Sequence, residues 1–153
     1  MSEGAVDNSG ELVAIPDFLD RFLSFEDGVI SRIAVVLPRG NNEGRQIELE
    51  IQALDRTAEG DGAPYGALFG WKLVRLTLGE ILGYSLSETP SDPFQVLYDG
   101  LKLEFLGDQF VLDLDPGPDD WSPFTIQDPA TSYSKRYVLA KRASFEVLDG
   151  PFI

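Results

Sequence analysis

The densest group of side chains that could do chemistry is a run of carboxylates between residues 113 and 120. Four aspartates fall within these positions: Asp113, Asp115, Asp119 and Asp120. Clustered carboxylate oxygens are the ligands that calcium takes in proteins. The spacing departs from the EF-hand loop, because counting from Asp113 puts glycine at the fifth position instead of the sixth and phenylalanine at the twelfth. We interpret the run as a solvated acidic loop, and we expect neither a metal ion nor a cofactor.

Two short patterns imitate catalytic signatures. Residues 132–135 fit the S-x-x-K pattern of serine-acylating enzymes, and residues 137–141 fit the Y-x-x-x-K pattern found beside dinucleotide sites. Both signatures need a helix to bring their two residues together, whereas residues 137–141 have the alternation of a strand. We therefore interpret both patterns as coincidences.

Two residue types on which many enzymes depend are missing. The chain has no histidine and no cysteine, which excludes the usual general base, the serine-histidine-aspartate triad, thiolate chemistry and disulfides. Carboxylate pairs drawn from the 26 acidic residues could still serve a hydrolase. We expect a protein without enzymatic activity, and a carboxylate-based hydrolase stays as an alternative.

The charge balance indicates the kind of partner. Twelve basic and 26 acidic residues give a net charge of -14, which disfavours binding to nucleic acid or to an anionic membrane. A basic protein is the natural complement, although the same charge can serve solubility alone. The first ten residues lack the features of a signal peptide, and no apolar run is long enough to span a membrane. We expect a cytoplasmic protein.

Aromatic residues follow the acidic run and mark a candidate contact region. We predict that a partner contacts five residues here, chosen for their loop position: Trp121, Asp115, Asp119, Asp120 and Tyr133. The alternative is that the aromatic side chains cover an edge of the core. The basic pairs at 135–136 and 141–142 are expected to neutralise the acidic loop or nearby strands rather than to bind an anion.

The acidic run leaves the clearest structural element in the sequence, a β-hairpin over residues 101–114. A two-residue turn at Gly107-Asp108 pairs apolar residues with one another, with Phe105 opposite Phe110. The same register places Lys102 opposite Asp113 on the other face, as an attractive cross-strand pair. A slip by one residue would lose both features, so the register is specified.

The other elements are mainly strands. The spacing of apolar residues predicts one short helix over residues 16–24, and strands over 29–37, 45–54, 68–78, 81–86 and 136–148, the last with a bulge near Lys141-Arg142. We predict a disordered lead at 1–10 and a single β-rich domain at 11–153. The fold class is mainly β: an antiparallel sandwich or a strongly curved sheet of about seven to nine strands, with the one helix against it.

One stretch resembles a known family. Residues Phe25-Glu26-Asp27-Gly28-Val29-Ile30 resemble the opening of the bacterial immunity proteins catalogued as immunity protein fifty, in which an aromatic residue, His-Asp and a small residue precede a strand. Glu26 stands here where that family has histidine. The resemblance implies an intracellular antitoxin that binds a toxin and has no catalysis of its own. We therefore expect an acidic protein-binding domain, with a domain that binds a small molecule or a larger assembly as the alternative.

Overall fold

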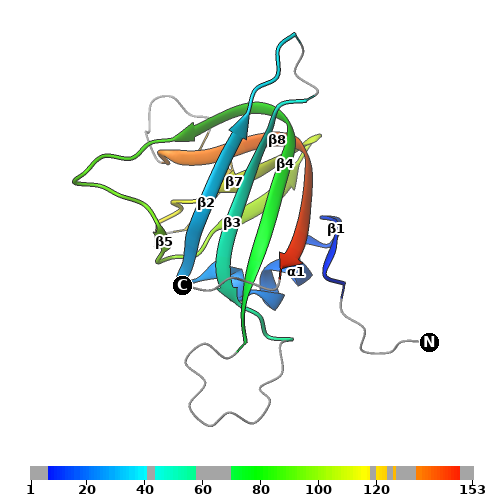
Figure 1. The fold of residues 1–153 in the computed structure, drawn as a ribbon, viewed down its shortest axis with the longest axis vertical. Helices are drawn as coiled ribbons and strands as arrows, with labels where there is room; N and C mark the ends of the chain where they lie inside the picture. The colour runs from blue at the N-terminus through cyan, green and yellow to red at the C-terminus, as the bar shows by residue number, and fades with distance from the viewer. Residues whose placement is uncertain are drawn as a thin grey trace.

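The protein folds into one curved antiparallel sheet with a helix at one end (Figure 1). The computed structural model describes residues 7–40, 44–57, 70–117, 120–123, 126 and 134–148. Within these ranges the sheet has eight strands and curls into a half-barrel. The prediction of a mainly β fold with a strongly curved sheet and one short N-terminal helix is confirmed.

The strand order joins segments that are far apart in the sequence. The elements are β1 (Ser9–Glu11), α1 (Ile15–Arg21), the 3-10 turn η1 (Leu23–Phe25), β2 (Gly28–Val36), β3 (Gln46–Leu54), β4 (Trp71–Leu86), β5 (Val96–Leu97), β6 (Lys102–Leu106), β7 (Gln109–Asp113) and β8 (Arg136–Leu148). In space the order is β5-β2-β3-β4-β8-β7-β6, and β1 also pairs with β8. In the described chain, no helix is long and apolar enough to cross a membrane.

The predicted hairpin is present as β6 and β7, in the predicted register. Phe105 pairs with Phe110 and Lys102 with Asp113, around a turn in which Gly107 has a φ of 69°. At one end the rings of Phe105 and Phe110 are in contact, as the pairing predicts, and Phe105 is 53% exposed. At the other end the expected attraction between Lys102 and Asp113 is not an ion pair of the described chain, because the buried Asp113 carboxylate binds Ser134, Asp115 and Trp121.

The longest strand, β4, corrects the prediction of two separate strands. In the sequence, Gly79 indicates the end of a strand. In the structure, the next residue, Glu80, has a φ of 50°, which is unusual inside a strand. The chain continues as one strand because β8 pairs with β4 on both sides of this point. The register shift lies between Ile81 and Gly83 on β4, so the predicted bulge near Lys141 falls on the opposite strand.

At residues 8–10 the N-terminal segment differs from the disordered lead predicted at 1–10, of which residues 1–6 lie outside the described residues. Ser9 and Gly10 belong to β1, paired with Glu146 and Phe145 of β8, and the N–H of Val147 donates to the carbonyl of Asn8 at 2.6 Å. This strand is polar and lacks alternation, so its sequence carries no strand pattern. Its order comes from hydrogen bonds to a strand more than 130 residues away in the chain.

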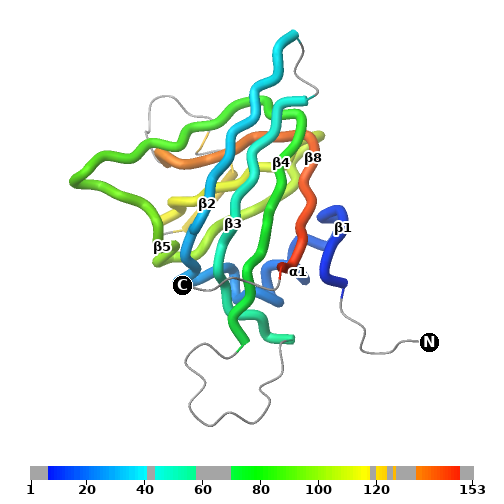
Figure 2. The backbone as a smooth tube through the Cα atoms, in the orientation of Figure 1, coloured from blue at the N-terminus to red at the C-terminus, as the bar shows by residue number. Residues whose placement is uncertain are grey.

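Helix α1 lies at the end of the half-barrel at which β2 begins and β8 ends (Figure 2), and aromatic rings pack between them. Phe18 contacts the rings of Phe22, Phe25 and Phe145, with centroids 5.0 to 5.6 Å apart. Phe22 and Phe25 are almost completely buried. The helix is therefore held by its one aromatic face, as its spacing predicts, and it ends earlier than predicted, at Arg21.

An unusual backbone turn follows the helix. Leu23, Ser24 and Phe25 all have φ between 53° and 61°, a left-handed conformation that costs about 1–2 kcal/mol for each residue other than glycine. The turn is held because Phe25 is buried and because the carbonyl of Ser24 accepts the N–H of Leu101 at 2.9 Å. A Cβ at Gly100 would overlap that same carbonyl oxygen, so glycine is required there.

The outer face of the sheet is polar, and its charges are paired. Arg32 lies 3.1 Å from Glu50, and Arg75 lies 3.6 Å from Glu50 and 3.1 Å from Glu146. These ion pairs cross four neighbouring strands, β2, β3, β4 and β8. Charges of the two signs therefore alternate on this face and leave no strong local field.

Candidate binding surfaces

The predicted contact region is organised around a buried aspartate. Asp113, at the end of β7, accepts hydrogen bonds through Oδ1 from the Ser134 hydroxyl at 2.6 Å and the Asp115 N–H at 2.9 Å. Its Oδ2 accepts the indole N–H of Trp121 at 2.8 Å. Burial raises the pKa of Asp113; these three donors oppose the shift without cancelling it, and the charge of Asp115 adds to it. Asp113 therefore anchors the chain that follows the hairpin.

The five predicted contact residues have different positions. Trp121 and Asp115 are half-buried, and both bind Asp113 as described. Asp120 is exposed, whereas Asp119 and Tyr133 lie outside the described residues. The structure thus brings Trp121 and Asp115 together, with their polar groups used inside the chain. Their contact with a partner stays a prediction, and so does the alternative that the aromatic side chains cover an edge of the core.

Arg136 occupies the other side of this region as a buried cation. Its Nη2 lies 3.0 Å from the Asp92 carboxylate, and its Nη1 lies 3.3 Å from that of Asp115. The guanidinium also donates to the carbonyl of Ser87 at 2.7 Å and lies over the ring of Phe94, 4.5 Å from the centroid. The expectation that residues 135–136 neutralise the acidic loop is confirmed for Arg136.

A shallow hollow of about 230 Å³ lies beside Arg136. Tyr98, which is 76% exposed, and Asp99 form part of its wall. The one guanidinium in it already has two carboxylates and two carbonyls as partners. The guanidinium of Arg136 therefore offers a new ligand little unused hydrogen-bonding capacity.

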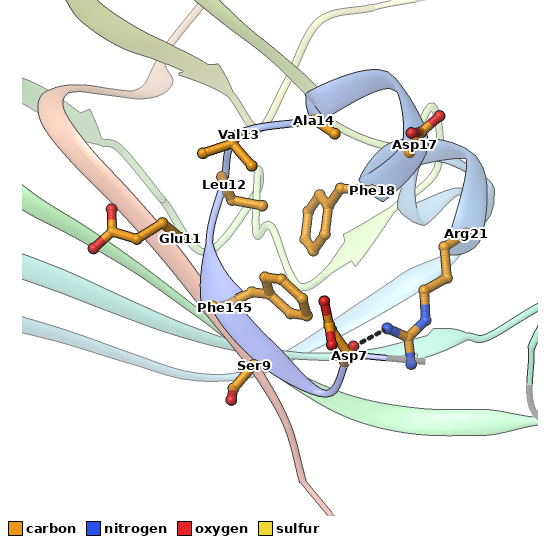
Figure 3. Close-up of a pocket in the computed structure, with 11 residues that line it drawn as sticks. Asp7, Ser9, Glu11, Leu12, Val13, Ala14, Asp17, Phe18, Arg21 and Phe145 are labelled. Atoms are coloured by element: carbon orange, nitrogen blue, oxygen red, sulfur yellow. Dashed lines mark hydrogen bonds between the residues drawn. The ribbon is translucent and has the colours of Figure 1, made fainter. Parts of the chain in front are cut away.

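A second hollow, of about 250 Å³, lies between β1 and α1 (Figure 3). The rings of Phe18 and Phe145, 5.0 Å apart, form its apolar floor. Figure 3 shows these rings side by side beneath the segment that carries Leu12 and Val13. Three exposed carboxylates line it: Asp7, Glu11 and Asp17.

The cation in this hollow, Arg21, is already neutralised. Its guanidinium forms two hydrogen bonds with Asp55, at 2.9 and 3.1 Å, and donates to the carbonyl of Asp7 at 2.6 Å. Burial raises the pKa of Asp55, but hydrogen bonds from Arg21 and Thr57 and the charge of Arg21 outweigh it, so the pKa is lowered. Asp55 is therefore ionised at neutral pH and balances Arg21.

A third hollow, of about 550 Å³, lies on the other side of Val13, between α1 and β6. It is lined by apolar side chains and one carboxylate: Val13, Ile15, Pro16, Leu19, Leu103, Phe105 and Glu104. Val13, which is 89% exposed, lines both this hollow and the one in Figure 3. We call the two hollows together the β1–α1 surface.

The carboxylates of the β1–α1 surface have no cationic partner within the described chain. None of the ion pairs there includes Asp7, Glu11, Asp17 or Glu104. An apolar surface thus lies between uncompensated negative charges. The outer face of the sheet, where the charges are paired, has the opposite arrangement.

Sequence reasoning missed this surface because it assigned residues 1–10 to a disordered lead. One signal was available: residues 12–14, Leu-Val-Ala, are all apolar and come directly before α1, which has its own apolar face. That is more apolar surface than a seven-residue helix can bury against one sheet. The surplus is what the structure leaves exposed at Val13.

Metal ligation has no support in the described ranges, where no three carboxylates are grouped closely enough to hold an ion. Comparison with protein-family models, curated proteins and solved structures finds no match for this chain.

Proposed function

We propose that this chain is a protein-binding domain without catalysis of its own, and that it binds a basic partner at the β1–α1 surface. The observation that carries the proposal is Val13, an apolar side chain 89% exposed between two hollows with carboxylates at their margins. Isolated apolar residues are common on surfaces, but an apolar patch between charges of one sign is typical of a binding site.

The chemistry of the surface defines the partner. Lysine and arginine side chains pair an apolar stem with a charged end, so their stems can lie on the rings of Phe18 and Phe145 while the charge reaches Asp17 or Glu11. Apolar side chains of the same partner would fill the hollow beside Phe105. A basic amphipathic segment combines both properties.

Protein docking fits these dimensions better than small-molecule binding. Small-molecule sites usually enclose about 300–1,000 Å³ and cover most of the ligand. The hollow with the aromatic floor measures about 250 Å³, below this range, and the one beside Phe105 measures about 550 Å³ but is too open to solvent to cover most of a small ligand. Surface hollows of this kind receive individual side chains from a partner.

The resemblance at residues 25–30 narrows the proposal to an antitoxin that occludes a basic toxin. The net charge of -14 would accelerate association with a positively charged partner and make the rate sensitive to salt. Co-expression with the product of a neighbouring toxin gene tests the antitoxin proposal: cells that express both proteins should grow, and cells that express the toxin alone should not. Loss of protection with Val13→Lys would place the contact on the β1–α1 surface.

The broader form can be tested with a defined probe. A leucine- and lysine-rich amphipathic peptide is titrated into ¹⁵N-labelled protein, with a leucine- and glutamate-rich analogue as the matched control. We expect saturable shifts around Val13, Asp17 and Phe145 for the basic peptide only, weaker at high salt. Val13→Lys should weaken binding at least tenfold, whereas Leu82→Lys, at a site 49% exposed on β4, should not. Shifts confined to residues 113–121 would contradict the assigned surface.

A further inference from the structure

One edge of the sheet is open along most of a strand. On the side away from β3, β2 pairs with β5 only through Gly28 and Val29, and Ile30 donates its N–H to Gln95 at 2.8 Å. From Ser31 to Val36 no strand of the described chain pairs with β2 on that side. In an antiparallel sheet, alternate residues of such an edge direct N–H and C=O groups outward.

Between the bulge at Ser31 and Pro38, this edge lacks the features that usually prevent pairing. Edge strands are commonly short, or carry lysine, proline or an inward-pointing charge. The four residues Ile33 to Val36 are all apolar and uncharged, and the chain continues with Leu37 before Pro38. Ile33, Val35 and Val36 are between 36% and 42% exposed. The edge is therefore a template for another strand.

We propose that β2 pairs antiparallel with β2 of a second copy, about a two-fold axis at Ala34. This register sets Ile33 opposite Val35 of the other copy and Arg32 opposite Val36. Ile33 and Val35 pair with Leu49 and Ile47, which are fully buried, so they lie on the core face of the sheet. The dimer would therefore extend the apolar rows of the core across the junction.

Charge supports a second copy as the occupant. No carboxylate occurs in β2, in a chain with 26 of them, and its one charged residue, Arg32, would face an apolar residue. The pairing thus brings no like charges opposite each other. The bulge at Ser31, together with Pro38, limits the paired segment to residues 32–36 in this register. The proposal does not depend on the β1–α1 surface.

The two associations should respond to salt in opposite directions. Two copies with a net charge of -14 repel each other at long range, and salt screens that repulsion. Dimerisation should therefore strengthen between 50 and 500 mM NaCl, whereas binding of a basic peptide weakens. Sedimentation of the protein over a concentration series at both salt levels distinguishes them. A monomer at every concentration and at both salt levels would overturn the proposal.

The absence of cysteine permits a direct test of the register. Opposed residues in an antiparallel pair have Cα atoms about 4.5–5.5 Å apart, within the range of a disulfide. Ala34→Cys should therefore form a disulfide-linked dimer under mild oxidation. Val36→Cys is the matched control, because the two copies of residue 36 would be about 13 Å apart along the strands. Equal cross-linking of both variants would overturn the register.

A charge at the edge tests the interface without cysteine. Val35→Lys should weaken the dimer at least tenfold, and Leu82→Lys should leave it unchanged. If Val35→Lys fails to fold, amide hydrogen exchange of the unaltered protein replaces it: residues 31–36 should be better protected at high protein concentration than at low. Protection independent of concentration, or a dimer disrupted equally by Leu82→Lys, would show that another surface is used.

Discussion

The chain that follows β7 and the β1–α1 surface both combine aromatic rings with carboxylates, yet they use them in opposite ways. After β7, Asp113, Asp115 and Trp121 bind one another or Arg136. On the β1–α1 surface, Asp17 and Glu11 have no cationic partner among the described residues, and Val13 is almost fully exposed. A dense cluster of polar and aromatic side chains is therefore a weaker sign of a binding site than side chains that the fold leaves exposed and without a partner.

The largest expected effect on stability comes from Asp113→Ala. It leaves the donors of Ser134, Trp121 and Asp115 without their acceptor and should lower the free energy of unfolding by about 3 kcal/mol. Asp120→Ala, at an exposed position of the same segment, is the control and should change it by less than about 0.5 kcal/mol. Urea denaturation measures both. Similar small losses for the two would mean that Asp113 is no anchor.

A second prediction concerns Asp55, the partner of Arg21. Its lowered pKa means that it stabilises the fold above its unfolded-state pKa of about 4, and this contribution is lost as the pH falls through the folded-state pKa. Asp55→Asn should cost about 2 kcal/mol at pH 7, and the difference should shrink below pH 4. The pKa of Asp113 is raised, so the opposite trend is expected there: the difference in the free energy of unfolding between the wild type and Asp113→Ala should grow as the pH falls towards 4. If the two stability differences changed with pH in the same direction, the predicted difference between Asp55 and Asp113 would be wrong.

Trp121→Phe should have a smaller effect, because it keeps the aromatic bulk and removes the indole donor to Asp113 Oδ2. We expect a loss of about 1–2 kcal/mol in the free energy of unfolding and little change in affinity for the basic peptide. Denaturation and titration are measured on the same preparation. A large loss of affinity for the peptide with unchanged stability would indicate that the partner contacts the segment after β7 instead.

The smallest effect on stability is expected for Val13→Ser. Since the side chain is 89% exposed, the free energy of unfolding should change by less than about 0.5 kcal/mol. Affinity for the basic peptide should nevertheless fall severalfold, as measured by calorimetry. A marked loss of stability would show that Val13 packs against the fold instead of awaiting a partner.

The sequence predicts the hairpin and the helix, because short-range spacing of residues determines both. The register of β6 and β7 follows from a two-residue turn and alternating residues, and α1 follows from the helical spacing of its apolar residues. β1 could not be predicted, because its order comes from hydrogen bonds to β8. The strand end expected at Gly79 is absent for a related reason: β4 pairs with the distant strand β8 on both sides of this residue.

The candidate site was harder to predict, because exposure is a property of the whole fold. Alternation correctly places Asp113 on the face opposite Leu112, and only the return of Trp121 and Ser134 buries it. The exposure of Val13 depends on how far the sheet extends towards α1. Neither quantity is encoded in a short window of sequence, so residue types alone directed attention to the segment after β7.

The position of β8 bears on how the protein reaches its fold. This strand pairs with β1, β4 and β7, so three strands have an unsatisfied edge until residues 136–148 are in place. Contacts between segments so distant in sequence slow folding and prolong the exposure of unpaired strands. During synthesis, the earlier strands must therefore remain without their shared partner until β8 has left the ribosome, and this interval is when the chain is most exposed to aggregation.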